Sequence, residues 1–207
     1  MNVADYVLLG LLLVAVFIGS KRGFFAGLLG AVALIAGVIF SINYVDWTTN
    51  KLLEHMKVST IMIVFLSFVF MFVLVYIGAK LLGNLFYKVG SFRPLGKVDK
   101  IGGAVVGVFQ GWILLGFLLF LLIFLPLPDS FVAKLDTSFF APGMRGVIPL
   151  IYEETTFLHP QSPYLVDKIK TALETEPGEE SQKIMGSASD DTHVRRIIDA
   201  MEYYFGR

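Results

Sequence analysis

The sequence predicts an all-α fold: an integral membrane bundle of about four transmembrane helices, followed by a C-terminal tail of short amphipathic helices. Of the 207 residues, 56% are hydrophobic and only 16% are charged, whereas a soluble domain carries about 25% charged residues. The charges are also unevenly distributed. Residues 1–128 carry nine Lys/Arg against four Asp/Glu, a net charge of +5, and residues 129–207 carry eight against thirteen, a net charge of −5. The chain therefore divides into a membrane domain, 1–128, and an acidic tail, 129–207.

Four apolar runs account for the membrane domain, because a membrane helix needs about 20 mostly apolar residues. The predicted spans lie near residues 3–20, 23–45, 58–79 and 101–125. The first is the shortest, with an uncharged apolar run of only 6–20. It reaches membrane-spanning length if Asp5 lies at the interface, where a carboxylate in the first turn also suits the helix dipole. A re-entrant segment is the alternative for this run.

Loop charge predicts the orientation of these spans. The link between the first two spans contains two basic residues and no acid, and the link between the last two contains five Lys/Arg against one Asp. Cytoplasmic loops of membrane proteins carry an excess of Lys and Arg. Both links are therefore expected in the cytoplasm, which places both termini outside it. The residues expected to set this topology are Lys21, Arg22, Arg93, Lys97 and Lys100.

The tail contains three sets of apolar residues at helical spacing, within 144–151, 165–173 and 194–205. Stretches rich in Gly, Ser, Glu and Asp near 176–192 are expected to be flexible linkers. The tail helices are too short and too charged to cross a membrane. They are expected to pack on the outer face of the bundle, to lie in the membrane interface or to bind a partner, and the four spans are expected to fold without them.

Small residues recur along one side of two predicted spans. They are Gly103, Gly107 and Gly111 in the fourth span, and Ala26, Gly30 and Gly37 in the second. Small residues four apart form a groove in which another helix backbone can approach closely. Two interpretations follow: the second and fourth spans pack together within one monomer, or the groove is the interface of a homo-oligomer. The first is favoured, because small residues are general packing devices in membranes.

Three polar residues of the membrane domain are candidates for a functional role. Gln110 lies in the middle of the fourth span, where a buried amide is expected to bond to a neighbouring helix, with a pore-lining role as the alternative. Asp99 lies between Lys97 and Lys100, where an interfacial ion pair or a helix cap accounts for it. Asp5 is explained by the membrane interface, or alternatively faces a polar cavity.

No sequence motif points to catalysis. The histidines, His55, His159 and His193, lack the spacing of metal ligands, and the chain has no HExxH, serine elbow or phosphate-binding loop. No ionisable residue lies at the centre of a predicted span, where proton-coupled carriers place such groups. No basic tract suits nucleic acid. The sequence therefore predicts a protein that is not an enzyme, holds no cofactor or metal, binds no nucleic acid, and has the lipid bilayer as its first partner.

Two blocks of the sequence have the order and spacing of a known family. The first is Ala4-Asp5-Tyr6, an apolar run and then Gly19-Ser-Lys-Arg-Gly23-Phe24, which leads into a Gly/Ala-rich span. The second is Val98-Asp99-Lys-Ile-Gly102-Gly-Ala-Val-Val-Gly107, an aspartate at the glycine-rich start of the fourth span. Together they resemble the colicin V production protein (CvpA) family, over roughly residues 1–128. Where that family often has an acidic residue after the basic turn, this chain has Ala26-Gly27.

The resemblance implies a bacterial inner-membrane protein connected with the biosynthesis or export of a colicin V-like toxin and with envelope homeostasis. The favoured hypothesis is a non-enzymatic accessory or scaffold whose outer tail docks an extracytoplasmic protein partner. The alternative is an oligomeric channel or small-solute transporter, with a pore lined near Gln110, Ser67 and Asn43.

Overall fold

The computed structural model describes residues 2–56, 58–89, 96–160, 164–174 and 187–206, and its regular secondary structure is helical throughout these ranges. Four helices are long and apolar enough to cross a membrane. They are α1 (Val3–Arg22), α2 (Phe24–Asn43), α4 (Thr60–Val89) and α5 (Lys97–Leu121), the last continued by the 3-10 turn η1 (Leu122–Phe124). The prediction of an all-α membrane bundle with about four spans is confirmed.

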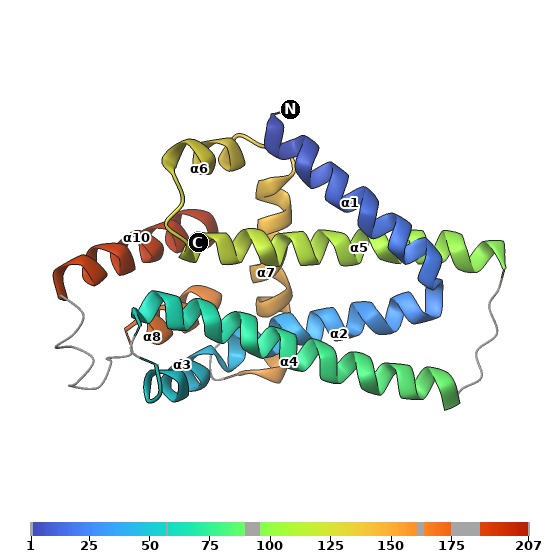
Figure 1. The fold of residues 1–207 in the computed structure, drawn as a ribbon, viewed down its shortest axis with the longest axis horizontal. Coiled ribbons are helices and arrows are strands. Elements are labelled where there is room, and N and C mark those ends of the chain that lie inside the picture. The colour runs from blue at the N-terminus through green and yellow to red at the C-terminus, as the bar shows by residue number, and fades with distance from the viewer. Residues whose placement is uncertain (1, 57, 90–95, 161–163, 175–186, 207) are drawn as a thin grey trace.

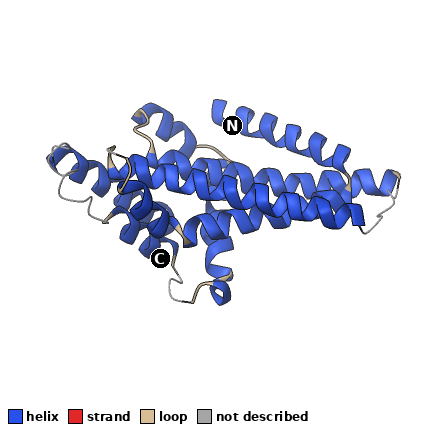
Figure 2. Ribbon diagram, turned by 60° about the horizontal axis from the view of Figure 1, so that its bottom comes forward, coloured by secondary structure: helices blue, strands red, loops and turns tan. Residues whose placement is uncertain are grey.

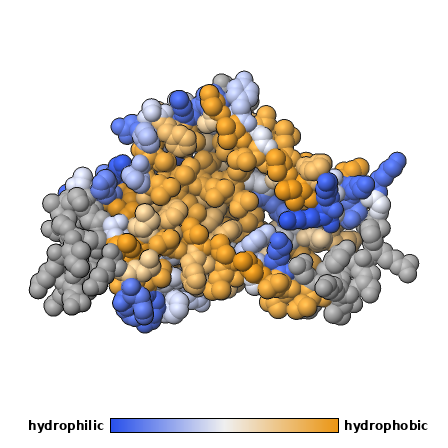
Figure 3. Space-filling view, in the orientation of Figure 1, coloured by the Kyte–Doolittle hydropathy of each residue, from blue (hydrophilic) through white to orange (hydrophobic). Residues whose placement is uncertain are grey.

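The spans share one long axis, with α5 at the centre. In Figure 1, α2, α4 and α5 run side by side along this axis, and α1 leans across α5. The most extensive contacts join α1 to α5 and α2 to α4, while α1 and α2 touch little beyond their turn. Figure 3 shows a broad apolar face over the middle of the molecule, with hydrophilic residues gathered toward its margins. An apolar middle with polar margins is the pattern expected of a protein that lies across a bilayer.

Aromatic side chains fill the centre of the bundle. Phe68 of α4 lies edge-on to Phe120 of α5, with ring centroids 5.3 Å apart, and Phe72 stacks on Phe117 at 4.5 Å. Three of these four rings are at most 1% exposed. Stacked and edge-to-face rings at such distances favour each other beyond the area they bury. The contact between α4 and α5 is therefore apolar, and it is made by large rings and not by a close approach of the two backbones.

The tail forms short helices, as predicted, and all of them except Ala141–Glu154 lie toward one end of the bundle (Figures 1 and 2). They are α6 (Asp129–Asp136), α7 (Ala141–Glu154), the 3-10 turn η2 (Thr156–Leu158), α8 (Leu165–Leu173) and α10 (Ser187–Phe205). A further short helix, α3 (Val45–Leu53), lies at the same end between α2 and α4. We call α3, α6, α8 and α10 together the cap. Of the segment expected to be a linker, residues 187–192 belong to α10, and 175–186 lie outside the described residues.

Helix α7 is part of the bundle itself. It crosses α5 at a steep angle (Figure 1), and the crossing point is Gly116, where a Cβ would lie 3.0 Å from the carbonyl carbon of Met144. Only a glycine lets the two backbones come this close. On α7, Ile148 and Tyr152 are fully buried against the ends of the spans. The division at residue 128 therefore separates segments that share one core.

The apolar faces of α8 and α10 continue the same core. Their buried side chains are Leu165, Ile169, Ala172, Leu173, Ile197, Met201 and Phe205. Two ion pairs tie the cap together: Lys168 of α8 to Asp46 of α3 at 2.8 Å, and Lys170 of α8 to Glu202 of α10 at 2.5 Å. The tail helices were expected on the bundle, in the membrane interface or on a partner, and the structure shows α8 and α10 packed on the bundle. Their apolar faces are thus already covered.

Candidate functional site

A seam of three glycines joins α5 to α1. Gly103, Gly107 and Gly111 lie along one side of α5, and all three face α1. A Cβ on Gly107 would lie 2.8 Å from the carbonyl oxygen of Ala15 and 3.2 Å from the Cα of Gly19. The two backbones approach as closely as small residues allow. We call these three residues the glycine seam.

The glycine seam lies against a different helix from the one that the sequence suggested. We expected this groove to receive α2, whereas α1 fills it. Helix α2 does pack on α5, but beside the seam and not in it. The small residues of α2 contact both α5 and α4. Gly30 lies beside the Gln110 amide of α5, Gly37 lies against a ring of α4, and Ala26 is half-buried. All these contacts are made within one chain.

The Gln110 amide ties α5 to α2. Its Nε2 atom donates a hydrogen bond of 2.5 Å to the carbonyl oxygen of Gly27. Gly30 makes room for this amide, because a Cβ there would lie 2.8 Å from Nε2. The polar group in the middle of α5 therefore has its partner on a neighbouring helix of the same chain.

Asp99 caps a helix to which it does not belong. The chain turns at Gly23, with a φ of +83°, and α2 begins at Phe24. The Phe24 N–H donates a hydrogen bond of 2.9 Å to Oδ1 of Asp99, in the first turn of α5. Glycine suits position 23 because it adopts positive φ without strain and because a Cβ there would overlap the Asp99 carboxylate. Asp99 thus satisfies an N–H that has no partner within α2 and holds the α1–α2 turn against α5.

Asp5 is fully buried at the start of α1, where four donors reach its carboxylate. The Ser138 hydroxyl donates to Oδ1 over 2.6 Å, and the N–H groups of Phe139 and Phe140 donate over 2.8 and 3.3 Å. The Asn2 N–H donates to Oδ2 over 2.7 Å, as part of the capping box of α1. The carboxylate therefore lies at the N-termini of both α1 and α7, where the helix dipoles favour negative charge. We call these five residues the Asp5 cluster.

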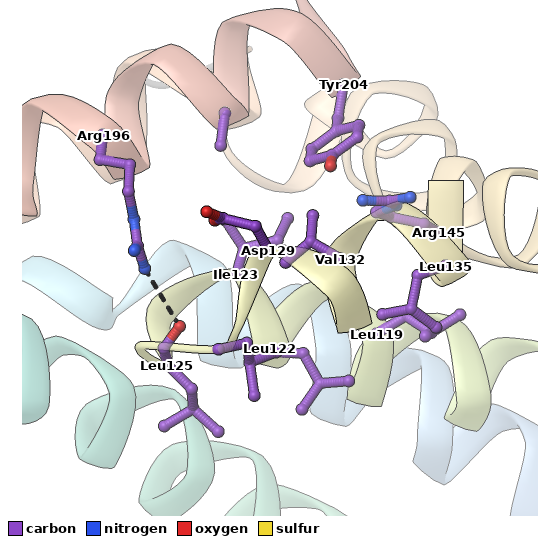
Figure 4. A pocket seen from close by; sticks show the side chains of 12 residues that line it. Leu119, Leu122, Ile123, Leu125, Asp129, Val132, Leu135, Arg145, Arg196 and Tyr204 are labelled. Atoms are coloured by element: carbon purple, nitrogen blue, oxygen red, sulfur yellow. Dashed lines mark hydrogen bonds between the residues drawn. The ribbon is translucent and has the colours of Figure 1, made fainter. Parts of the chain in front are cut away.

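A cavity of about 250 Å³ lies between the end of α5, α6 and α10 (Figure 4). Its walls are mostly aliphatic: Leu119, Leu122, Ile123, Leu125, Leu127, Val132, Leu135 and Ala200. Arg196 and Asp129 lie toward one side of it, and Arg145 and Tyr204 lie toward the other. We call it the cap cavity. An apolar hollow with a few polar groups at its edge is the usual form of a binding site.

The two arginines of the cap cavity differ in what they already bind. Arg145 is buried, pairs with Asp136 at 3.0 Å and lies 3.6 Å from the Tyr204 ring centroid. The Tyr204 hydroxyl donates to both oxygens of Asp136 at 2.9 Å, and burial, the largest effect, raises the pKa of Tyr204. Arg196 is exposed and donates to the Leu125 carbonyl over 3.3 Å. A guanidinium has five N–H donors, so Arg196 retains donors for a ligand.

Sequence analysis missed a buried polar cluster where α3, α7 and α8 meet. Tyr152 and His159 are both buried, and their rings stack with centroids 3.9 Å apart. The Lys168–Asp46 ion pair lies in the same region. Burial, and secondly the Asp46 carboxylate, raise the pKa of Tyr152 to about 12. Asp46 and Lys168 are 122 residues apart in the chain, so no local pattern could have joined them.

The basic residues predicted to set the topology gather at one end of the bundle. Lys21 and Arg22 lie at the α1–α2 turn, and Lys97 and Lys100 lie in the first turn of α5 (Figure 1). All four are exposed. Arg93 lies outside the described residues. The cap occupies the opposite end.

No group of three or more His, Asp or Glu residues in the described part of the chain could hold a metal ion. The polar groups of the cap cavity are two guanidiniums, one carboxylate and one phenol, which can donate or accept hydrogen bonds.

Comparison with protein families gives a match over most of the chain. The family model described as Colicin V production protein matches residues 4–149. The matched region begins at the Asp5 cluster, contains the glycine seam and ends within α7, so it extends past the membrane domain predicted from sequence. No curated protein and no solved structure matches the chain.

Proposed function

The chain belongs to the colicin V production protein family, and we propose that it serves toxin biosynthesis or export as a non-enzymatic accessory or scaffold. Membership of this family supports a role in colicin V production. We further propose that the protein acts as an accessory, lies in the bacterial inner membrane and takes part in envelope homeostasis. The partner we propose is an extracytoplasmic protein that docks on the cap.

The orientation in this proposal puts both termini and the cap outside the cytoplasm. Its support is the position of Lys21, Arg22, Lys97 and Lys100 at the end of the bundle away from the cap, since basic residues favour the cytoplasmic side. The chain has no cysteine, so single cysteines test this directly. A membrane-impermeant maleimide should label Lys51→Cys of α3 in intact spheroplasts, and Val98→Cys of α5 only after permeabilisation. The reverse pattern would invert the orientation.

The cap cavity carries the proposal. Its volume of about 250 Å³ is below the roughly 300–1,000 Å³ typical of small-molecule sites, and it suits one or two apolar side chains of a partner protein. Arg196 at its edge suits an acidic group beside those side chains, because charged partners of a guanidinium bind through strong, directional hydrogen bonds. The apolar faces of α8 and α10 are packed in the core, so the cavity, and not those faces, offers the docking surface.

Two substitutions in the cap cavity test this role. Ala200→Phe fills the cavity and Arg196→Ala removes its exposed cation. Both should lower toxin production in a strain that lacks the native gene, with unchanged amounts of the protein in the membrane. Arg195→Ala is the matched control, since Arg195 is a neighbouring exposed arginine that does not line the cavity. Wild-type toxin production by both cavity variants would rule out docking at this cavity.

The channel alternative has less support from the bundle. Two of the side chains named for a pore are bonded within it: Gln110 to Gly27, and the Ser67 hydroxyl to the Ile63 carbonyl over 2.8 Å. A conduction path would then have to lie between subunits of an oligomer. Solute flux into liposomes that hold the purified protein, lost in Gln110→Leu, would favour the channel over the accessory role.

A further inference from the structure

A second, larger hollow opens between the spans. It measures about 690 Å³ and lies between α1 and α4, with α5 as its floor and α6 at one end. Residues from each helix include Val7 of α1, Val73 of α4, Leu118 of α5 and Lys134 of α6. We call it the lateral groove. In Figure 1, α1 and α4 lie on opposite sides of α5.

The lateral groove faces the bilayer. The helices that form its sides, α1 and α4, are the least buried of the four spans. In the most apolar 18-residue stretch of each helix, 17% of α1 and 22% of α4 is buried, against 44% of α2 and 56% of α5. Leu118 on the floor is 48% exposed. Because these segments lie at the level of the hydrocarbon core, lipid chains surround the groove.

Large side chains line the groove, and its one charge lies at one end. Every lining residue is apolar except Lys134, and the only small residue among them is Ala4. Membrane helices associate through small residues that let their backbones approach, so this lining is unsuited to a partner helix. A row of Leu, Val and Phe side chains instead suits flexible acyl chains.

Lys134 lies where the groove meets the cap. Its side chain is exposed, and no ion pair among the described residues involves its ammonium group. The acids of α6 and of the start of α1 have other roles: Asp136 pairs with Arg145, and the Asp5 carboxylate accepts its four hydrogen bonds. Asp129 lines the cap cavity. The Asn2 amide holds the Lys134 carbonyl at 2.5 Å, which fixes the helix end that carries the lysine. The ammonium group therefore has no carboxylate partner in the described chain.

We propose that the lateral groove binds a phospholipid with an anionic headgroup. Its acyl chains lie along Leu118 and the neighbouring apolar side chains, and its phosphate lies against the Lys134 ammonium. In the orientation proposed above, this lipid comes from the outer leaflet. The lipid fills the space between α1 and α4, which have no extensive contact with each other.

Lipid retention by the purified full chain tests the proposal. Native mass spectrometry in mild detergent should detect one bound phosphatidylglycerol per chain, in preference to phosphatidylethanolamine. Lys134→Gln should weaken phosphatidylglycerol binding about fivefold, the effect of one basic side chain near an anionic lipid. Leu118→Trp should displace the lipid, because the indole fills the floor of the groove. Matched controls are Lys51→Gln, at the same end of the molecule, and Val32→Trp, on an exposed position of α2 outside the groove.

A second measurement separates lipid binding from a general loss of fold. Added phosphatidylglycerol should raise the thermal midpoint of delipidated wild-type protein, since a ligand that binds only the folded state stabilises it. The rise should be absent in Leu118→Trp and smaller in Lys134→Gln. Equal retention of both phospholipids by wild type and variants would overturn the proposal. So would a dimer that Leu118→Trp converts to monomers, because a second copy would then occupy the groove.

Discussion

The Ser138 hydroxyl donates a 2.6 Å hydrogen bond to the Asp5 carboxylate across 133 residues of chain. This hydrogen bond and those donated to Asp5 by the Phe139 and Phe140 N–H groups hold the start of α7 against the start of α1. A membrane interior offers few alternative partners for such groups. The aspartate that the sequence placed at an interface is therefore a structural junction between the first span and the tail.

Removal of the Asp5 carboxylate should destabilise this junction. Asp5→Leu removes the acceptor of the Ser138 hydroxyl and of the part-buried Phe139 N–H, at a cost of about 1–3 kcal/mol for each group left unpaired. The Phe140 N–H keeps the Ser138 hydroxyl oxygen as an acceptor at 3.2 Å. Asp5→Asn keeps one acceptor oxygen and should lose less. Thermal unfolding in detergent gives the ranking, and hydrogen exchange should show faster exchange at Phe139 and Phe140. Equal stability of Asp5→Leu and wild type would contradict the role assigned to the cluster.

The glycine seam should not tolerate even a methyl group. Gly107→Ala places a Cβ 2.8 Å from the Ala15 carbonyl oxygen, and overpacking of this kind costs about 1–3 kcal/mol. Gly78→Ala is the matched control, since nothing lies within 4 Å of a Cβ at that position of α4. We expect a lower thermal midpoint for Gly107→Ala alone. If both variants unfold at the wild-type midpoint, the α1–α5 contact is looser than described.

Asp99 should act through its oxygen and not through its charge. Asp99→Ala removes the acceptor of the Phe24 N–H and should cost about 1 kcal/mol, the usual loss of a helix cap. Asp99→Asn keeps an acceptor and should remain close to wild type. An ion pair with Lys97 or Lys100 as the main role predicts instead that both variants lose equally. Thermal midpoints at low and high salt distinguish the two.

Burial of Tyr152 predicts a loss of stability at alkaline pH. Below the ordinary tyrosine pKa of about 10, the folded and unfolded states both hold the proton. Above it, the unfolded state ionises, while the folded state keeps the proton up to a pKa of about 12, so this residue lowers stability by about 1.4 kcal/mol per pH unit in that window. Tyr152→Phe should show a shallower fall of the thermal midpoint between pH 10 and 11. An identical slope in both proteins would show that Tyr152 is not buried.

Truncation should separate the two views of the tail. A chain that ends at residue 128 lacks α7, and the core that α7, α8 and α10 cover would be open. We expect it to be sparse in the membrane and readily cleaved by protease. A chain that ends at residue 160 keeps α7 and the Asp5 cluster and should accumulate better. Equal abundance and protease resistance of the 1–128 chain and the full chain would support the independent four-span bundle suggested by the sequence.

The spans could be predicted because hydropathy is local. Each of the four helices lies within a few residues of its apolar run, although α5 begins at Lys97, before that run, and α4 continues to Val89. The glycines of α5 also predicted that another helix backbone approaches α5 closely, since small residues four apart form a groove on a helix. The identity of the neighbour could not be read, because α1 and α2 both offer small residues.

The partners of the polar residues could not be predicted, because they are distant in the chain. Asp99 caps a helix that begins 75 residues earlier, and Lys168 meets Asp46 across 122 residues. A single sequence shows that such a group requires a hydrogen-bond donor or an opposite charge. It does not show which residue supplies that partner. The cap cavity was unforeseen for the same reason, since it forms only where α5, α6 and α10 converge.

The contact of α1 with α5, and hardly with α2, has a consequence for the way the protein is made. A ribosome delivers α1 to the membrane before α5, because the groove that receives α1 is synthesised some 80 residues later, at about 5–20 residues per second. During that interval α1 lies in the membrane beside α2, with which it makes few contacts. Its C-terminal half makes its final contact when Gly107 packs against Ala15. Its N-terminal end does so when the Ser138 hydroxyl bonds to the Asp5 carboxylate. Although α1 precedes the other three spans in the chain, it is therefore among the last of the four to make its final contacts.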